Sequence, residues 1–421
     1  MKIKTRKLSY EEVLKIEGKK LKKPKKPNML FRVLLKLVSL PDLLSVKFKA
    51  NKINLDKLNK KEQCFILMNH SSFIDLEIAV SVLFPRPMNI ICTSDGFVSK
   101  NWLMREIGCI STVKFTTDTK LVREMLYAVK KLKTSILMYP EAGYSFDGTA
   151  TTLADNIGKC VKLLNLPVVS IISKGAYHRQ PLYNNLIKRK VPVSVDVEYI
   201  LTKEDIACKS EAEISDIIKQ KFGFDNFKWQ QENNIIIDHP RRAEGLNRVL
   251  YKCPHCLNEG NLKGEGIYLT CPKCDKKYEL TIDGYMKAVD GVTEINHIPN
   301  WYKWERECVK NEILNHTYKQ ECDVDVYLMM DTYNIYELGQ GHFIHDENGF
   351  VLDAFDGKLH VEQSSLTSYS VNADFFWYQI GDTICIGDNK YRYYCFPRDK
   401  QDVVAKMRLA AEELFKIKNN K

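Results

Sequence analysis

Apolar runs along the chain predict its first regular elements. Phe65–Met68 is apolar throughout and predicts a buried strand, and Leu76–Val80 predicts the beginning of an apolar helix. A third run, at 136–139, predicts another strand, which leads into Pro-Glu and then into small and polar residues. Between the first strand and the helix lie five polar residues: Asn69, His70, Ser71, Ser72 and Asp75. Polar side chains are therefore concentrated where two buried elements meet.

The pattern changes in the last third of the chain. Residues 301–316 predict a helix, and after it apolar and polar residues alternate in short runs, as in half-buried strands. Asn348-Gly349 and residues 387–389 predict hairpin turns, and residues 399–417 predict an amphipathic helix. We therefore expect residues 285–421 to form a mainly-β domain closed by a helix, similar in outline to pleckstrin-homology-like domains.

Near the N-terminus, a basic tract at residues 19–26 precedes an amphipathic segment. Apolar residues recur between Met29 and Leu40, with Arg32 and Lys36 on the other side. As a helix, the stretch before Pro41 would span about 18 Å, too little to cross a bilayer of roughly 30 Å. Such a helix suits the membrane interface, where lysines meet anionic headgroups. The alternative is a helix packed on its own domain, and we expect no nucleic-acid partner.

Composition limits the class of protein and locates its charge. The 421 residues are too many for one ordinary core, and 44% hydrophobic with 28% charged residues is typical of a soluble globular protein. The net charge of +10 arises in residues 1–50, which hold 15 Lys and Arg against 4 Asp and Glu. We find no long apolar run and no signal peptide. Thirteen cysteines, mostly scattered, indicate free thiols. We therefore expect a cytoplasmic protein, peripheral on the cytoplasmic face of the membrane.

Four of the cysteines form a metal-type pattern. Cys253 and Cys256 form one C-x-x-C pair, and Cys271 and Cys274 form another, with fourteen residues between the pairs. Four thiolates give the closed tetrahedral site of structural zinc. The pattern resembles a zinc ribbon, which we place at residues 246–284. His255 lies inside the first knuckle, and we expect it to be exposed rather than a ligand. The metal should hold the fold and take no part in catalysis.

The spacing of His70 and Asp75 constrains how their side chains meet. On one continuous helix, five residues would leave the two side chains about 140° apart. With His70 in a loop and the helix beginning at Ser71 or Ser72, Asp75 can hold one ring nitrogen while the other faces a substrate. The histidine would then be a general base for a hydroxyl group. The structural alternative is a capping box from Ser72 to Asp75, in which the carboxylate only satisfies a backbone amide.

Four blocks in this order resemble the glycerolipid acyltransferase family, whose best-known bacterial members are lysophosphatidic acid acyltransferases. They are N-H-x4-D at 69–75, G-x-I-x-x-x-K at 108–114, Y-P-E-x-G at 139–143 and L-P-V-V at 166–169. The resemblance implies an α/β acyltransferase domain with a mixed sheet flanked by helices. We place this domain at residues 51–245, after a basic N-terminal arm at residues 1–50.

The resemblance also implies roles for single residues. His70 would deprotonate the acceptor hydroxyl, Asp75 would orient it, and Glu141 would complete the catalytic set. Substrate binding would fall to other residues of the blocks: Asn69, Ser72, Gly108, Lys114, Gly143, Ser145 and Pro167. Lys114 stands where the family usually has an arginine for the phosphate, and Pro167 opens the block associated with the acyl donor.

The third block departs from the usual F-P-E-G-T-R-S of the family. Ala142 replaces the first glycine, and Tyr144 or Ser145 stands where an arginine is expected, which removes a fork-shaped phosphate ligand. Either Lys174 or Arg179 supplies the missing charge, or the acceptor is a modified or non-phosphate glycerolipid. The fourth block also departs, because it ends in serine in place of the usual proline.

Together these features predict a membrane-associated O-acyltransferase of phospholipid biosynthesis. As the resemblance implies, it would transfer a fatty acyl group from acyl-CoA or acyl carrier protein to the hydroxyl of a lysophospholipid such as 1-acyl-glycerol-3-phosphate. Zn²⁺ would be its structural metal, and its partners would be donor, acceptor and an anionic membrane surface. Two alternatives stay open. One is a different lipid acceptor or thioester hydrolysis, and the other is a non-catalytic lipid- or nucleic-acid-binding module.

Overall fold

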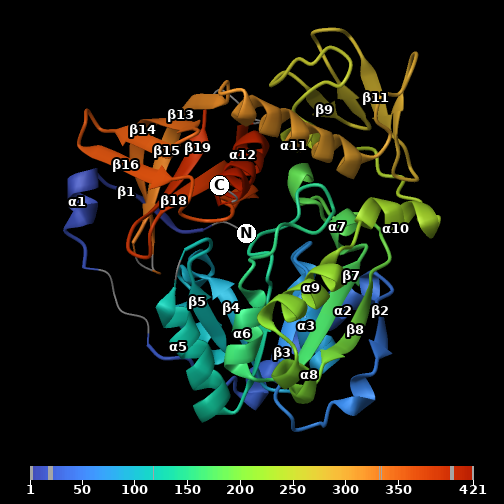
Figure 1. The fold of residues 1–421 in the computed structure, drawn as a ribbon, viewed down its shortest axis with the longest axis vertical. Helices are drawn as coiled ribbons and strands as arrows, with labels where there is room; N and C mark the ends of the chain where they lie inside the picture. The colour runs from blue at the N-terminus through green and yellow to red at the C-terminus, as the bar shows by residue number, and fades with distance from the viewer. Residues whose placement is uncertain are drawn as a thin grey trace.

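The computed structural model describes residues 3–17, 22–116, 118–330, 332, 334–398 and 403–419. Figure 1 shows two lobes, an α/β lobe below and an antiparallel β lobe above, with a small four-stranded sheet beside the upper lobe. Among the described residues, no helix combines the length and apolarity needed to span a membrane.

A seven-stranded sheet forms the centre of the α/β lobe, in the order β2-β8-β7-β3-β6-β4-β5. Its strands are β2 (Lys49–Ile53), β3 (Phe65–Met68), β4 (Met88–Thr93), β5 (Cys109–Thr112), β6 (Ser135–Met138), β7 (Val168–Lys174) and β8 (Ser194–Leu201). Neighbouring strands are parallel except for β7 and β8. The mixed sheet flanked by helices that we predicted is confirmed.

Helices bury both faces of this sheet. They are α3 (Ile74–Leu83), α4 (Asn101–Glu106), α5 (Thr119–Tyr127), α6 (Ile157–Leu164), α7 (Ala176–Arg179), α8 (Lys203–Cys208), α9 (Glu211–Phe222) and α10 (Asn226–Glu232), with short helical turns η1 (Leu55–Lys57), η2 (Ser94–Phe97), η3 (Ala128–Leu132) and η4 (Leu182–Asn184). Ile66 and Met68 of β3 pack into a core shared with α3, whereas Phe65 and Leu67 pack into a core shared with α5, α6 and α9. A strand buried on both faces is apolar at every position, as the sequence of β3 is.

Helix α2 (Met29–Ser45) continues through Pro41, where we expected it to end. A proline inside a helix costs about 3 kcal/mol or more. However, Leu43 and Val46 beyond it are buried, and burying such a side chain contributes about 1.5–3 kcal/mol. The packing of the last turn therefore offsets the lost backbone hydrogen bond.

The first residues of the chain join the β lobe. Strand β1 (Thr5–Lys7) pairs in parallel with β14, with Thr5 opposite Ile335, and the short helix α1 (Tyr10–Leu14) follows. The predicted arm at residues 1–50 is thus not one structural unit. Residues 18–21, which include part of the predicted basic tract, lie outside the described residues.

The segment predicted as a ribbon at residues 246–284, together with residues 286–288 beyond it, forms a separate antiparallel sheet in the order β12-β11-β10-β9. The strands are β9 (Lys263–Glu265), β10 (Tyr268–Thr270), β11 (Lys277–Leu280) and β12 (Met286–Ala288), preceded by the helical turn η5 (Leu246–Arg248). The two cysteine pairs lie in the loops before β9 and after β10.

The β lobe contains one antiparallel sheet and two long helices. The sheet has the order β16-β15-β14-β13-β19-β18-β17. Its elements are α11 (Ile298–Leu314), β13 (Lys319–Met329), β14 (Ile335–Asp346), β15 (Gly349–Ala354), β16 (Leu359–Ser364), β17 (Asn372–Trp377), β18 (Gly381–Gly387), β19 (Arg392–Pro397) and α12 (Val403–Asn419). Both predicted hairpins are present, between β14 and β15 and between β18 and β19. The predicted closing helix is α12, although residues 399–402 lie outside the described part of the chain.

Candidate active site and metal centre

His70, in the loop between β3 and α3, contacts Asp75 in the first turn of α3, a helix that begins later than the expected Ser71 or Ser72. Helix α3 begins at Ile74, and Nδ1 of His70 lies 3.1 Å from Oδ2 of Asp75. The same oxygen accepts hydrogen bonds from the backbone amides of Ser71 (2.7 Å) and Ser72 (3.0 Å). Asp75 therefore orients the imidazole and also ties the loop to the start of the helix. The Asp75 carboxylate thus makes the predicted contact with the imidazole and also the backbone-amide contact of the capping alternative.

The imidazole of His70 lies between two tyrosine rings. Its centroid is 4.2 Å from that of Tyr139 and 3.9 Å from that of Tyr144, each at an interplanar angle of 28°. Burial lowers the pKa of His70 below its usual value, although the Asp75 carboxylate opposes that shift. The ring is therefore neutral near pH 7, as a general base must be. When Nδ1–H donates to Asp75, the lone pair available for a substrate proton is on Nε2.

Glu141 supports the same loop from the neighbouring strand. Because β3 and β6 are parallel neighbours, the residues that follow them reach the same edge of the sheet. Oε2 of Glu141 accepts a hydrogen bond from the backbone amide of His70 (2.7 Å), and Oε1 accepts one from that of Thr151 (3.2 Å). Burial raises the pKa of Glu141 to about 8, against the two amide bonds that lower it. These contacts are those of a positioning residue behind the histidine.

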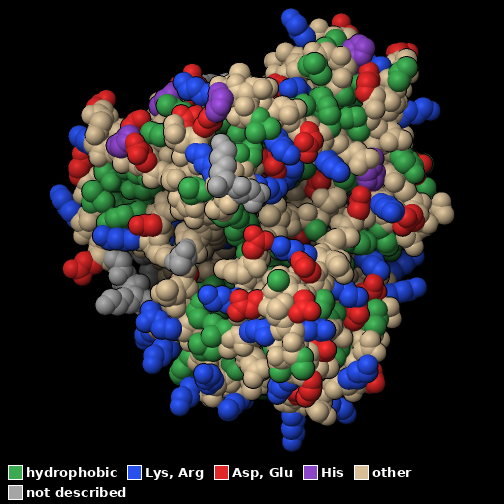
Figure 2. Space-filling view, in the orientation of Figure 1, with side chains coloured by type: hydrophobic (Ala, Val, Ile, Leu, Met, Phe, Trp, Pro, Cys, Tyr) green, Lys and Arg blue, Asp and Glu red, His purple; other side chains and the backbone are tan. Residues whose placement is uncertain are grey.

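A cleft of about 1430 Å³ lies beside His70 between the two lobes. Figure 2 shows the surface hollowed along this boundary. The volume exceeds the roughly 300–1,000 Å³ of common small-molecule sites, so the cleft has room for a long substrate. On the α/β side, Phe73, Leu76, Tyr139 and Tyr144 line it close to the histidine. An acyl chain is suited to such apolar walls.

Two of the predicted substrate-binding residues, Ser72 and Lys114, line the cleft with His70. Asn69 lies behind it and joins β3 to β7, because its side chain accepts a hydrogen bond from the Ser173 amide (2.7 Å) and donates one to the Ser173 carbonyl (3.2 Å). Ser145 is buried in a tight turn, where its hydroxyl donates to the Thr149 carbonyl (2.6 Å). Asn69 and Ser145 therefore shape the loops around the site and do not face a substrate.

The three remaining predicted positions lie outside the cleft lining. Gly108 ends α4 with a φ of +91°, and a Cβ there would come within 3.1 Å of the Met88 carbonyl oxygen, so a backbone turn explains this glycine. Pro167 accepts a hydrogen bond from the Phe65 amide (2.8 Å) at the amino edge of the sheet, opposite the edge that carries the histidine. Gly143 lies in the loop after β6, with nothing within 4 Å of a Cβ built on it.

The two cations that we considered as replacements for the missing arginine have other partners. Lys174 forms an ion pair with Asp196 (2.6 Å), and Arg179, which is buried, forms one with Asp42. Lys174 and Arg179 are both absent from the cleft lining. Lys114 is therefore the only predicted phosphate ligand that the described structure places there.

The β lobe supplies a wall of the cleft that sequence patterns did not predict. Tyr369, Asp374, Trp377 and Tyr378, from β17 and the segments beside it, line the cleft opposite the histidine. These residues are about three hundred positions away from His70 along the chain, and no local pattern marks them. Only the pairing of distant elements brings them to the site.

Helix α12 contacts the loop that carries Tyr144. Nη1 of Arg408 donates a hydrogen bond to the Tyr144 carbonyl (3.2 Å), and the guanidinium lies 4.3 Å from the centroid of the Phe146 ring. Glu412, one turn further on, pairs with Arg408 (3.4 Å) and with Arg306 of α11 (2.7 Å). The loop beside the histidine is therefore fixed by a helix from the other lobe.

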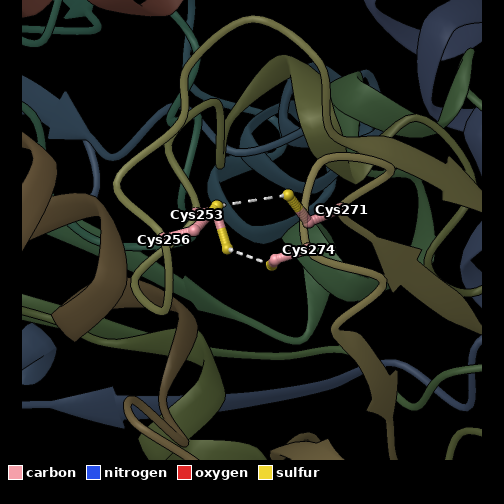
Figure 3. A group of neighbouring side chains, drawn as sticks. All are labelled: Cys253, Cys256, Cys271 and Cys274. Carbon is pink, nitrogen blue, oxygen red and sulfur yellow. Dashed lines mark hydrogen bonds between the residues drawn. The ribbon is translucent and has the colours of Figure 1, made fainter.

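The four cysteines converge as the C-x-x-C pattern predicts (Figure 3). Their sulfur atoms all lie within 4.8 Å of one another, with 3.9 Å from Cys253 to Cys274 and 3.7 Å from Cys256 to Cys271. A tetrahedral ion with Zn–S bonds of 2.3 Å requires sulfur atoms about 3.8 Å apart. The group therefore fits a closed four-thiolate metal site. His255 is half-exposed and bonds Glu294 (2.8 Å), so it is no ligand.

The fold and the site are together those of an enzyme that activates a hydroxyl group. A carboxylate-oriented, neutral histidine stands at the carboxyl edge of a mixed α/β sheet, beside a long cleft with apolar walls. This is the arrangement that general-base activation of a hydroxyl group requires.

Comparison with known proteins identifies the family of this domain. Residues 49–174 match the Acyltransferase family. This segment is therefore similar to an acyltransferase domain, in agreement with the family resemblance of the four sequence blocks that it contains. Five chains of solved structures match. One is the crystal structure of the 1-acyl-sn-glycerophosphate (LPA) acyltransferase PlsC from Thermotoga maritima, which is 16% identical with a TM-score of 0.35. The match covers 45% of this chain and 76% of that one. No curated protein matches.

Proposed function

We propose that this protein transfers a fatty acyl group from an acyl thioester to the hydroxyl of a lysophospholipid. The observation that carries the proposal is the His70–Asp75 pair at the floor of the cleft, within a domain of the acyltransferase family. The sequence resemblance makes 1-acyl-glycerol-3-phosphate the first acceptor to test, and acyl-CoA and acyl carrier protein the donors. Zn²⁺ at the four cysteines serves the fold.

The proposed reaction uses His70 as the base. Nε2 removes the proton of the acceptor hydroxyl as its oxygen attacks the thioester carbonyl, and Asp75 stabilises the imidazolium that forms. The tetrahedral intermediate then expels the thiolate, to which the imidazolium returns the proton. The acyl group passes directly to the acceptor, so no acyl-enzyme accumulates. Glu141 keeps the backbone of the histidine in place through the amide bond.

Thiol release from an acyl thioester tests the proposal, with purified protein and with lysophosphatidic acid present or absent. His70→Ala is the test variant, and His316→Ala is the matched control, because that histidine is on the surface with a side chain 78% exposed. We expect release that needs the acceptor, a phosphatidic acid product by mass spectrometry, and loss of both only in His70→Ala. Release without any acceptor would instead indicate a thioesterase, and release unchanged in His70→Ala would exclude this base.

We further propose that α2 docks the protein on an anionic membrane surface, on its cytoplasmic face. One side of the helix packs into the α/β core through Phe31 and Leu35. The other side of the helix exposes a patch of apolar residues, which is rare on the surface of soluble proteins: Met29, Leu30, Leu34, Leu37, Val38 and Leu44. Trp102 of α4, 67% exposed, contacts Phe31 and extends this apolar patch. Lys22, Lys23, Lys25 and Lys26 lie just before the helix.

Co-sedimentation with vesicles tests the membrane contact. We expect binding to vesicles that contain an anionic phospholipid, weaker binding to purely zwitterionic ones, and loss of binding in a Leu30→Ser, Leu34→Ser, Val38→Ser variant. The control changes Leu314 and Leu366, which are also exposed but belong to the β lobe, to Ser. Equal binding of the test and control variants would contradict the assignment of this surface to α2.

A further inference from the structure

The wall that the β lobe contributes to the cleft is firmly attached to the acyltransferase domain. Phe375 of β17 stacks on Phe146 of the loop after β6, with centroids 4.1 Å apart. Nε1 of Trp377 donates a hydrogen bond to Oδ2 of Asp95 (3.2 Å), which follows β4. Phe115 and Tyr369 meet edge to face at 5.4 Å. The wall is therefore a fixed part of the site rather than a separate module that lies near it.

The segment that forms this wall has a strained backbone. Phe376, Tyr378 and Gln379 have φ values of +51°, +46° and +67°, which is the left-handed region that non-glycine residues rarely adopt. The Phe376 amide donates to Oδ1 of Asp382 (2.9 Å), and Asp382 forms an ion pair with Arg248 (2.8 Å). Strain of this kind persists where surrounding contacts impose it, and it clusters at binding sites. Tyr378 itself lines the cleft, and so does Asp374, two residues before Phe376 on β17.

The charges near the histidine are of both signs. Lys114 lines the cleft, as do the carboxylates of Asp95 and Asp374. Among the residues that the structure describes, none of these three forms an ion pair. Burial raises the pKa of Asp374 to about 7, although Lys114 lowers it. A positive ligand group placed beside Asp374 would compensate this carboxylate and favour its ionised form.

The acceptor's head group can be inferred from this arrangement. A phosphate monoester that pairs with Lys114 would bring about −1.5 to −2 charges near pH 7 close to the carboxylates of Asp95 and Asp374, which is unfavourable. A phosphate diester that also carries an amine has one charge of each sign. Its phosphate can pair with Lys114, while its cation lies between Asp374 and the rings of Tyr144 and Tyr378, all of which line the cleft.

We propose that the β-lobe wall selects a zwitterionic lysophospholipid as acceptor, with Asp374 as the residue that recognises the cationic part of its head group. This inference rests on the proposed acyl transfer and narrows its acceptor. It assigns the β lobe a direct part in substrate choice, which neither the acyltransferase match over residues 49–174 nor the predicted catalytic pair requires.

The test compares acceptors that share one acyl chain and differ in head group: lysophosphatidic acid, lysophosphatidylethanolamine and lysophosphatidylcholine. We expect wild-type kcat/KM to be at least tenfold higher for the zwitterionic acceptors. In Asp374→Asn we expect that advantage to disappear, mainly through a higher KM, while transfer to lysophosphatidic acid is kept or improved. The control is Asp353→Asn, an exposed carboxylate on β15 of the same sheet.

The outcomes separate the two proposals. Wild-type preference for lysophosphatidic acid, or an equal loss for all acceptors in a folded Asp374→Asn, would overturn this inference and leave the acyltransferase proposal standing. Transfer to no acceptor would overturn both. If Asp374→Asn does not fold, inhibition of the wild type decides: glycerophosphocholine should inhibit more strongly than glycerol 3-phosphate, and the reverse order would refute the inference.

Discussion

Replacing Asp75 with Asn would remove a charge beside His70 and keep the shape of the side chain. In the transfer step the imidazole becomes cationic, with Nδ1 3.1 Å from Oδ2 of Asp75. At an effective dielectric constant of about 20, the attraction over that distance is about 5 kcal/mol. This is an upper limit and corresponds to a roughly 10⁴-fold change in rate. We therefore expect kcat to fall by about 10²- to 10⁴-fold, with a smaller effect on KM.

The same variant should shift the pH dependence in a direction that distinguishes this account from simple damage. Asp75 raises the pKa of His70, so its loss lowers that pKa further. A base works above its pKa, so the acidic limb of the rate profile should move to lower pH while the plateau falls. Initial rates of acceptor-dependent thiol release between pH 5 and 8 measure both effects.

The control for this experiment is Asp216→Asn, an exposed carboxylate on α9. It should leave both the plateau and the acidic limb where they are in the wild type. A plateau of Asp75→Asn within threefold of the wild type, or an acidic limb displaced to higher pH, would refute the assigned role of the carboxylate. Because the amide oxygen of Asn can still accept from the two loop amides, the thermal midpoint should fall only modestly.

Three further predictions concern the loop, the helix that holds it and the metal. Burial raises the pKa of Glu141 from 4.5 to about 8. The folded state therefore binds a proton more tightly than the unfolded state, and the stabilisation that results is complete below pH 4.5 and is lost as the pH rises to 8. Glu141→Gln should therefore lose less unfolding free energy over that range in urea titrations, by a few kcal/mol. Arg408→Lys should lower kcat about tenfold with unchanged metal content. Lysine cannot both donate to the Tyr144 carbonyl and lie flat on the Phe146 ring. An unchanged kcat would contradict the role of Arg408 in fixing this loop. Elemental analysis should find one zinc ion per chain. Cys256→Ser should lose the zinc and lower the thermal midpoint by several degrees, whereas His255→Ala should keep the zinc.

The sequence was most informative where a function or a fold depends on neighbouring residues. The buried strand β3, the two hairpins and the four-thiolate group all follow from local spacing, and the structure confirms them. The contact between His70 and Asp75 was also deducible, because helix geometry allows it only across a loop. The catalytic and binding roles assigned to these side chains stay predictions until activity is measured.

The features that sequence did not predict depend on packing between distant segments. The continuation of α2 through Pro41 depends on what Leu43 contacts, and the pairing of β1 with β14 joins segments more than three hundred residues apart. Tyr144 occupies the place where an arginine was expected, and its stacking on the imidazole has no signature in the sequence. The same holds for the wall around Asp374, which is set by the docking of two lobes.

Helix α12 has a consequence for the order in which the protein matures. The ribosome makes residues 139–151, the loop around the histidine, long before it makes Arg408, which bonds that loop and lies against it. Until α12 has emerged and docked, the carbonyl of Tyr144 lacks this donor and the cleft lacks its far wall. The α/β lobe would thus be synthesised before the cleft beside His70 has both of its walls. Activity would begin only when the β lobe, with α12, has docked against the α/β lobe.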